Sequence, residues 1–123
     1  MSSIKRIGVF TSGGDAPGMN ACIRAVVRTG NYYGMEVFGV YQGYEGMIEG
    51  SIKKLSNSSV GNIIQRGGTV LGSARSDRFR DKYYRKIAKE QLDKFGIEAL
   101  VAIGGDGTFK GAYVFNEEHG VPT

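Results

Sequence analysis

The sequence contains few of the residues that form disulfides, thiolate metal sites and rigid turns. Its 123 residues include one cysteine, two prolines and no tryptophan. A lone cysteine excludes an internal disulfide and any site built from several cysteines. We expect Cys22 to be a small core residue on a helix, with a reactive thiol as the alternative.

Long hydrophobic runs are missing as well. No stretch approaches the roughly 18 consecutive apolar residues that a membrane span requires. Residues 1–6 lead directly into a strand-like segment, without the apolar region of a signal peptide. We therefore expect a cytoplasmic protein with no membrane partner.

Positive charge is in moderate excess. Lysine and arginine number 16 against 12 aspartates and glutamates, which gives a formal net charge of +4. This balance suits phosphorylated ligands as well as nucleic acid. Because the sequence has no long basic run interleaved with aromatics, and no helix-turn-helix or zinc-finger spacing, we expect no nucleic-acid partner.

Glycine is abundant, and its 20 residues gather at the ends of apolar runs, a pattern typical of buried parallel strands that end in turns. Strands are predicted at Arg6–Thr11, Glu36–Tyr41 and Glu98–Ile103, and helices at Met19–Tyr33, Asp77–Phe95 and Phe109–Glu118. Ser58–Ile64 is a candidate short helix, and Gln42–Gly50 is expected to be a loop. The alternation predicts an α/β fold, a three-layer αβα Rossmann-like parallel sheet.

Residues 121–123 have the pattern of an approach to a further strand. An open sheet that ended there would leave an edge and an apolar face uncovered. We therefore expect residues 1–123 to form an incomplete domain.

Two glycine-rich turns follow two of the predicted strands, at Ser12–Asp15 and at Gly104–Thr108. In an open α/β sheet such turns project from the carboxyl ends of the strands, where ligands bind. Glycine lets a phosphate approach the backbone and permits left-handed dihedrals that turn N–H groups toward an anion, and the helix that follows adds partial positive charge. The pair of turns predicts a phosphate site, although such turns also occur as plain connections.

Asp106 lies inside the second turn. A carboxylate and a phosphate repel each other, so a bridging Mg²⁺ is the natural partner of Asp106. Thr108 is expected to cap the following helix or to hydrogen-bond a phosphate oxygen. Neither the Walker A pattern nor the dinucleotide pattern G-x-G-x-x-G is present.

Arg75 ends a segment of small, turn-prone residues that begins at Arg66. An arginine in such a loop can reach into a site and spread its charge over phosphate oxygens. Arg78, Arg80 and the lysines of the helices are expected to be solvated charges, and His119 is expected at the surface.

Three segments together resemble the bacterial ATP-dependent 6-phosphofructokinase family in order and spacing. They are Ile7–Asn20, Arg66–Arg75 and Ile103–Thr108. The glycine-rich part of the third also occurs in NAD kinases and diacylglycerol kinases, whereas the first two make the resemblance specific. The family transfers the γ-phosphoryl group of MgATP to the 1-hydroxyl of fructose 6-phosphate.

The resemblance implies which residues form an ATP site. They are Gly14, Tyr44, Arg75, Ser76, Gly105, Gly107, Thr108 and Gly111, with Asp106 serving Mg²⁺. Arg75 would stabilise charge on the transferred phosphoryl group. Pyrophosphate-using relatives have a carboxylate at the place of Gly107, so glycine favours ATP as the donor. Ser76 replaces an aromatic residue that is common in the family.

The resemblance also implies partners outside the ATP site. An effector site for ADP or phosphoenolpyruvate would use Arg24 and Arg28. It departs from the family pattern at Asn57 and Asn62, where relatives have an arginine and an aspartate. A homotetramer is implied for the complete protein.

The family's Thr-Ile-Asp-Asn-Asp stretch, which holds the catalytic base, and its sugar-phosphate arginines are expected beyond Thr123. Residues 1–123 are therefore interpreted as a partial ATP-binding domain without the fructose 6-phosphate domain, inactive as a separate segment. Two alternatives stand beside this hypothesis. One is a nucleotide-binding module without turnover, and the other is a kinase of the NAD kinase or diacylglycerol kinase type.

Overall fold

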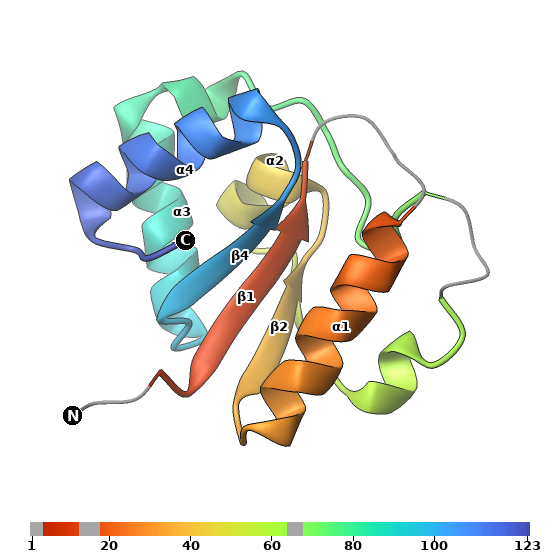
Figure 1. Ribbon diagram of the computed structural model, residues 1–123. Coiled ribbons are helices and arrows are strands. Elements are labelled where there is room, and N and C mark those ends of the chain that lie inside the picture. Colours follow the sequence, from red (N-terminus) through yellow and green to blue (C-terminus); the bar gives the residue numbers. More distant parts are fainter. Residues whose placement is uncertain (1–3, 13–17, 64–67) are drawn as a thin grey trace.

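The computed structural model describes residues 4–12, 18–63 and 68–123. Within these ranges the chain forms a four-stranded sheet in the order β3-β2-β1-β4 (Figure 1). The strands are β1 (Arg6–Thr11), β2 (Glu36–Val40), β3 (Ile52–Leu55) and β4 (Ala99–Ile103). β1 lies parallel to both β2 and β4, and helices cover both faces, which confirms the predicted α/β fold.

The edge strand β3, which was not predicted, adds an antiparallel pair to the predicted parallel sheet. It pairs antiparallel with β2, with Leu55 opposite Val37 and Ile52 opposite Val40. Its sequence Ile-Lys-Lys-Leu does not alternate as a half-buried strand usually does, because two exposed lysines separate its apolar residues. Lysine on an edge strand discourages pairing with other chains.

The described helices are α1 (Met19–Tyr32), α2 (Gly43–Glu49), α3 (Lys82–Lys94) and α4 (Asp106–His119), with the short 3₁₀ helices η1 (Asn57–Val60) and η2 (Arg78–Arg80). The helix predicted from Asp77 is thus divided, because the Asp81 carboxylate accepts a hydrogen bond from the Tyr83 N–H at 2.9 Å and caps α3. The N-cap of α4 is Gly105, so Thr108 does not cap this helix.

Helix α2 lies where a loop was predicted. Its sequence includes Gly43 and Gly46, and glycine disfavours helix by about 1 kcal/mol relative to alanine. The helix forms because it buries Tyr44, Met47 and Ile48 against the sheet and α3. Tertiary packing therefore outweighs local propensity in this segment.

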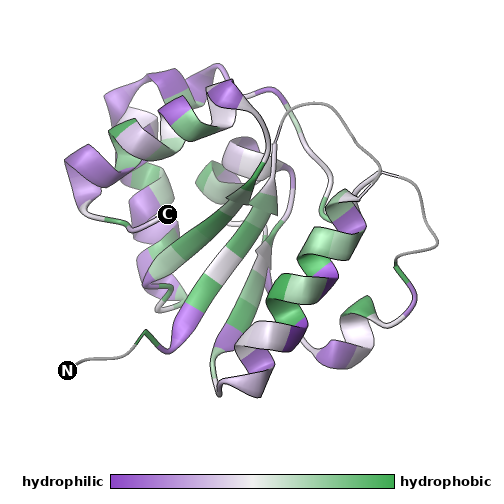
Figure 2. Cartoon of the chain, in the orientation of Figure 1, coloured by the Kyte–Doolittle hydropathy of each residue, from purple (hydrophilic) through white to green (hydrophobic). Residues whose placement is uncertain are grey.

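Each face of the sheet has a core of its own, since successive strand residues point to opposite sides. Helices α1 and η1 cover one face, and α2, α3 and α4 cover the other (Figure 1). The strands are largely hydrophobic, whereas the helices carry both hydrophobic and hydrophilic residues (Figure 2). Adjacent residues of β1 show the alternation, because Val9 joins the core under α1 while Phe10 joins the core under α2 and α4.

Cys22 is exposed, so the prediction that it lies in the core is wrong. The buried stripe of α1 consists of Met19, Ile23 and Val27, which follow one another at four-residue intervals. Cys22 lies about 100° around the helix from Ile23, the centre of that stripe. The thiol therefore falls just outside the contact with the sheet.

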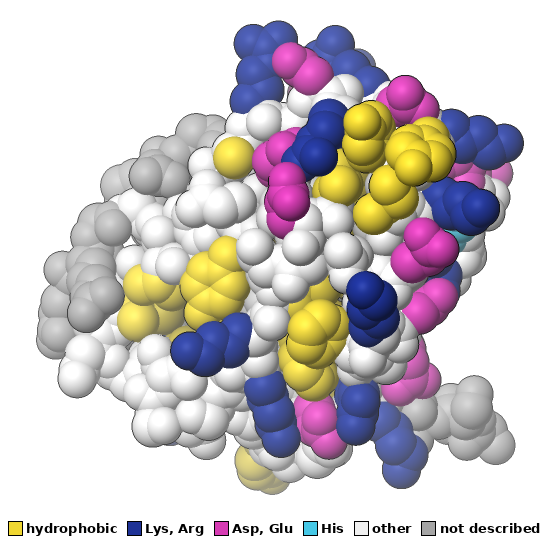
Figure 3. All heavy atoms as spheres, turned by 180° about the vertical axis from the view of Figure 1, so that it is seen from behind, with side chains coloured by type: hydrophobic (Ala, Val, Ile, Leu, Met, Phe, Trp, Pro, Cys, Tyr) yellow, Lys and Arg dark blue, Asp and Glu magenta, His cyan; other side chains and the backbone are white. Residues whose placement is uncertain are grey.

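The surface carries mixed charge. Figure 3 shows one face on which acidic side chains lie among the lysines and arginines rather than apart from them. In the described part of the chain, none of the helices has the length and apolar character needed to cross a bilayer.

Candidate functional site

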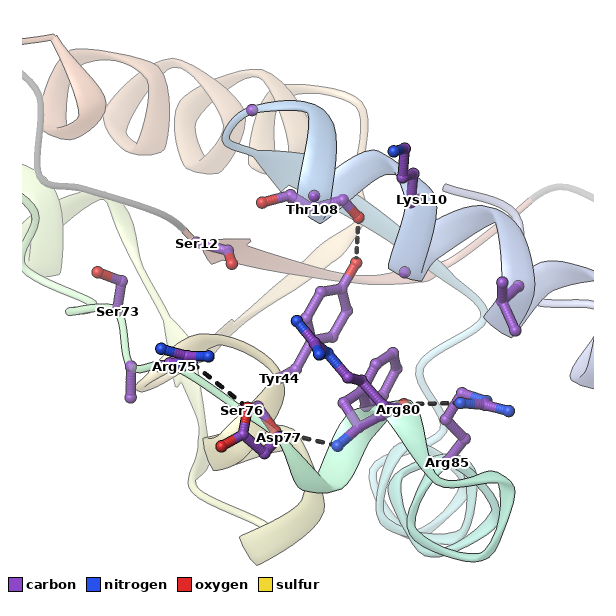
Figure 4. A pocket seen from close by; sticks show the side chains of 16 residues that line it. Ser12, Tyr44, Ser73, Arg75, Ser76, Asp77, Arg80, Arg85, Thr108 and Lys110 are labelled. Atoms are coloured by element: carbon purple, nitrogen blue, oxygen red, sulfur yellow. Dashed lines mark hydrogen bonds and ion pairs between the residues drawn. The ribbon is translucent and has the colours of Figure 1, made fainter.

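A cleft of about 890 Å³ opens at the carboxyl ends of β1 and β4, between α2, the segment 73–80 and the first turns of α4 (Figure 4). The structure brings most of the predicted ATP-site residues to this cleft. Those that line it are Tyr44, Arg75, Ser76, Gly105, Gly107, Thr108 and Gly111. Segments far apart in sequence therefore converge on one place.

The other predicted residues lie elsewhere. Asp106 does not line the cleft itself, but its neighbours Gly105 and Gly107 do. Gly14 falls outside the described residues. Arg24 and Arg28 lie on α1, on the opposite face of the sheet, where Arg28 is exposed and Arg24 is half-buried.

The segment before Arg75 is held to the end of β1 by a buried threonine. The hydroxyl of Thr11 donates to the Gly72 carbonyl at 2.8 Å and lies 2.9 Å from the Thr69 hydroxyl. Because Thr11 uses its one proton on Gly72, Thr69 is the donor in the second contact. The Gln42 N–H also donates to the Leu71 carbonyl at 2.9 Å. These bonds fix the loop beside the carboxyl end of the sheet.

The glycines of the second turn serve two different purposes. A Cβ on Gly104 would lie 2.5 Å from the Thr108 hydroxyl oxygen and 2.6 Å from the Ser12 carbonyl oxygen, so close packing requires glycine there. A Cβ on Gly105 or Gly107 would meet nothing within 4 Å. None of these three glycines has a positive φ, so the expected left-handed dihedrals are not present in this turn. The open space above Gly105 and Gly107 is what a phosphate requires.

Tyr44 forms the inner wall of the cleft. Its hydroxyl donates to the Thr108 carbonyl at 2.5 Å, and its ring stacks on Phe79 with centroids 4.0 Å apart. Burial raises the pKa of this hydroxyl, so it remains a donor at neutral pH. Gly111 lies against the ring, where an added Cβ would come within 3.1–3.2 Å of its atoms. Tyr44 therefore joins α2 to the first turn of α4.

Arg75 presents its side chain to solvent at the mouth of the cleft. The side chain is 82% exposed, and its Nε lies 3.3 Å from Asp77 Oδ1. Exposed ion pairs of this kind contribute about 0–1 kcal/mol, so the guanidinium is readily available to a ligand. Ser76 also lines the cleft, but its hydroxyl donates to Glu45 Oε1 at 2.8 Å.

Three further arginines correct or extend the sequence analysis. Arg78, expected to be solvated, is half-buried and paired with Glu45 and Glu49. Arg80, also expected to be solvated, is exposed but lines the cleft. Arg85 also lines the cleft, and the sequence analysis missed it.

Arg85 crosses from α3 to α4. Its Nε and Nη2 donate to the two carboxylate oxygens of Glu118 at 2.5 and 2.9 Å, and its Nη1 donates to the Phe79 carbonyl at 2.8 Å. The hydrogen bonds to Glu118 raise the pKa of Arg85 and lower that of Glu118. The available signal was its spacing, since Arg85 precedes the buried Ala88 and Leu92 by three and seven residues.

The residues around Asp106 suit Mg²⁺ shared with a phosphate. Asp106 is exposed at the first position of α4. The described residues contain no group of three or more His, Cys, Asp or Glu side chains that could hold a metal ion alone. Mg²⁺ is commonly bound by one or two carboxylates, water and substrate phosphates. One carboxylate beside the open space at Gly105 and Gly107 fits that arrangement.

Comparison with known proteins identifies the family. The sequence profile described as Phosphofructokinase matches residues 6–123. The chain is 58% identical over 119 residues to the ATP-dependent 6-phosphofructokinase of Cytophaga hutchinsonii, covering 97% of this chain and 36% of that relative. It is 60% identical over 119 residues to ATP-dependent 6-phosphofructokinase 1 of Thermus thermophilus, covering 97% of this chain and 37% of that one.

Comparison with solved structures also finds phosphofructokinases. Pichia pastoris phosphofructokinase matches with a TM-score of 0.91 and 42% identity, over 100% of this chain and 13% of that one. The pyrophosphate-dependent phosphofructokinase of Marinobacter aquaeolei shares the fold, with a TM-score of 0.80 at 21% identity over 97% of this chain and 31% of that one. The chain spans little more than a third of the length of the curated relatives it matches. From the profile match, which extends over nearly all of its residues, the chain belongs to the phosphofructokinase family.

Proposed function

We propose that the full-length protein containing this chain is an ATP-dependent 6-phosphofructokinase. It transfers the γ-phosphoryl group of ATP to the 1-hydroxyl of fructose 6-phosphate, and residues 1–123 form part of its ATP-binding domain. The observation that carries the proposal is the convergence of Tyr44, Arg75 and the Gly104–Thr108 turn on one cleft. The names of the bacterial relatives support the choice of substrates.

The shape and charge of the cleft suit the phosphate chain of a nucleotide. Gly105 and Gly107 leave open space at the start of α4, where the unpaired N–H groups of a helix attract anions. Arg75 extends from the opposite side with an exposed guanidinium. In the proposed reaction Arg75 stabilises negative charge on the transferred group, an effect that dominates phosphoryl transfer.

Asp106 is the proposed protein ligand of Mg²⁺. When bound, the ion neutralises charge on the phosphates. The side chain of Asp106 is at the helix start, between the two glycines that leave the phosphate space open. Its role is to hold the ion there, directly or through water.

The space at Gly107 supports ATP rather than pyrophosphate as the donor. A Cβ there would meet no protein atom within 4 Å, so the protein itself does not require glycine for packing. A carboxylate at this position would project into the open space and repel the α-phosphate of ATP. Glycine keeps that space free.

Further properties are proposed from the family resemblance. Arg24 and Arg28 are assigned to an effector site for ADP or phosphoenolpyruvate, away from the cleft. Asn57 accepts a hydrogen bond from Asn31 on α1 at 3.1 Å, so this segment does contact the helix that carries both arginines. A homotetramer and a cytoplasmic location remain predictions.

The test is turnover by the purified full-length protein. With MgATP and fructose 6-phosphate we expect ADP and fructose 1,6-bisphosphate in equal amounts, the product identified by ³¹P NMR. Parallel reactions replace the acceptor with NAD or a diacylglycerol, and the donor with pyrophosphate. Nucleotide binding without turnover would establish the non-catalytic module instead, and phosphorylation of NAD or lipid would establish the other kinase class.

A further inference from the structure

The Glu45 carboxylate connects α2 to the loop that carries Arg75. Its Oε1 accepts a hydrogen bond from the Ser76 hydroxyl at 2.8 Å, and its Oε2 accepts one from Arg78 Nε at 3.0 Å. Ser76 Oγ in turn accepts from the Phe79 N–H at 3.3 Å. The hydrogen bond from Arg78 is the main reason that the pKa of Glu45 is lowered. The carboxylate is therefore ionised and satisfied at neutral pH.

Glu45 also pairs with the arginine of this segment that does not face the cleft. Arg75, Arg78 and Arg80 follow one another within six residues, yet Arg75 and Arg80 line the cleft and Arg78 does not. Arg78 is held away by Glu45 and by Glu49, whose Oε1 lies 2.5 Å from its Nη2. The guanidinium of Arg78 is thereby kept out of the cleft.

The base of this connection has a constrained backbone at Gln42. Among the described residues, Gln42 is the one non-glycine residue with a positive φ, 64°, and Gly43 follows with a φ of 59°. Glycine adopts a positive φ readily, but in a non-glycine residue such as Gln42 it persists only where the surrounding structure determines it. The next two residues reach in different directions, Tyr44 to the Thr108 carbonyl and Glu45 to the Arg75 loop. The first turn of α2 thus fixes both walls of the cleft.

We propose that Glu45 is a positioning residue for Arg75. It holds Ser76 and Arg78, two of the three residues that follow Arg75, so that the long exposed side chain of Arg75 starts from a fixed backbone. This inference rests on the proposed function, because it assigns Glu45 an effect on phosphoryl transfer. A purely structural contact would stabilise the fold without acting through Arg75.

The kinetic test uses the full-length protein and four variants: Glu45→Ala, Glu45→Gln, Arg75→Ala and the double variant Glu45→Ala/Arg75→Ala. We expect Glu45→Ala to lower kcat about tenfold, with KM for ATP changed less than about threefold, because misplacing a catalytic group can cost up to about a hundredfold. Glu45→Gln keeps one carbonyl acceptor and should recover part of the loss. Glu49→Gln is the matched control, since it removes one partner of Arg78 and leaves Glu45 in place.

The double variant separates positioning from stability. If Glu45 acts through Arg75, adding Glu45→Ala to Arg75→Ala causes no further loss of kcat. A further loss of about tenfold in the double variant overturns the proposal, and so does a normal kcat in Glu45→Ala. Thermal unfolding of each variant is measured alongside, so that activity is compared among folded proteins.

Amide hydrogen exchange gives a readout that does not depend on the reaction. We expect faster exchange in residues 73–80 of Glu45→Ala, and unchanged exchange there in Glu49→Gln. Unchanged exchange in both overturns the claim that Glu45 holds this loop. A wild-type protein that does not phosphorylate fructose 6-phosphate refutes the proposed function and with it the kinetic effect of Glu45, while the exchange result still decides whether Glu45 holds the loop.

Discussion

The two faces of the sheet are built from different kinds of contact. The face under α1 and η1 is aliphatic, and its fully buried side chains are Val9, Ile23, Val27, Val37, Val60 and Leu71. The face under α2, α3 and α4 contains a run of ring contacts from Phe10 through Tyr44 and Phe79 to Phe115. It also contains the ion pair between Arg85 and Glu118.

This difference explains where the cleft is found. Aliphatic packing depends on shape and volume and has no preferred direction. Stacked rings, a tyrosine hydroxyl and a two-point arginine contact each have a preferred geometry, so they fix the relative positions of the elements they join. The cleft lies on the face that has these directional contacts. Changes there should impair ATP use, and changes on the α1 face should not.

The largest effect is expected for the two residues assigned to charge stabilisation. Arg75→Ala and Asp106→Ala should each lower kcat of the full-length protein by about a hundredfold or more, the scale observed when one stabilising group is lost. Lys89→Ala is the control, since Lys89 pairs with Asp93 along the surface of α3. The measurement is kcat at saturating substrate. If a variant keeps more than about a tenth of the wild-type kcat, the role assigned to that residue is wrong.

A methyl group added on each face gives a direct comparison. In Gly111→Ala the new Cβ would lie 3.1–3.2 Å from the Tyr44 ring, which must shift and move the wall of the cleft. We expect KM for ATP to rise about tenfold, because small displacements of a binding group are costly. In Gly61→Ala, beside η1, the nearest atom is the Ser58 carbonyl oxygen at an ordinary 3.7 Å. KM should stay within about twofold there, and equal effects of the two substitutions would contradict the difference between the faces.

Much of the fold could be predicted because the relevant signals are local. The β1 strand has the bounds that its apolar run predicts, Arg6–Thr11, and its flanking glycine turn marks the end. The α2 segment gave the wrong signal, because glycines suggest a loop and the burial of Tyr44 and Met47 is visible only in the folded chain. In the same way β3 depends on its antiparallel partner, Val37–Val40, rather than on its own pattern.

The site residues show the same contrast between local signals and distant contacts. Its glycine turn and Arg75 lie in short motifs, and these do reach the cleft. Glu45 and Arg85 gave no comparable motif, because each depends on a partner about thirty residues away: Ser76 is 31 residues from Glu45, and Glu118 is 33 from Arg85. A charged residue on a helix is usually solvated, so its role becomes visible only when its partner is known.

An intermediate effect, on stability rather than on kcat, is expected at the ion pair. Glu118→Ala removes the carboxylate partner of Arg85 and leaves, among the described residues, only its bond to the Phe79 carbonyl, so it should lower the free energy of unfolding by about 1–3 kcal/mol, the cost of leaving buried donors unsatisfied. Because the folded pKa of Glu118 is lowered, the contribution of the pair is fully present above the unfolded value of about 4.3 and is lost as pH falls through the folded value.

Urea unfolding of Glu118→Ala at pH 7 measures the size of the loss, and urea unfolding of the wild-type protein and of Glu118→Gln at pH 7 and at a series of lower pH values measures its pH dependence. The difference between the two proteins should be largest at pH 7 and should shrink as pH falls through the lowered pKa of Glu118, where the wild-type carboxyl also loses its charge. Glu117→Gln, at the exposed neighbouring position, serves as the control. A difference that stays constant with pH would show that the ion pair does not contribute through its charge.

The smallest effect is expected at Arg28, on the aliphatic face. Its side chain is exposed on α1 and lies on the other side of the sheet from the cleft. Without effectors, Arg28→Ala should leave kcat and KM for ATP within about twofold and the free energy of unfolding within about 0.5 kcal/mol, as is usual for surface substitutions.

Kinetics repeated with ADP and with phosphoenolpyruvate then test its assigned effector role, since any response of the wild-type protein should be weakened in the variant. If Arg28→Ala changes ATP kinetics in the absence of both compounds, the two faces are coupled through the sheet, and the separation drawn between them is wrong.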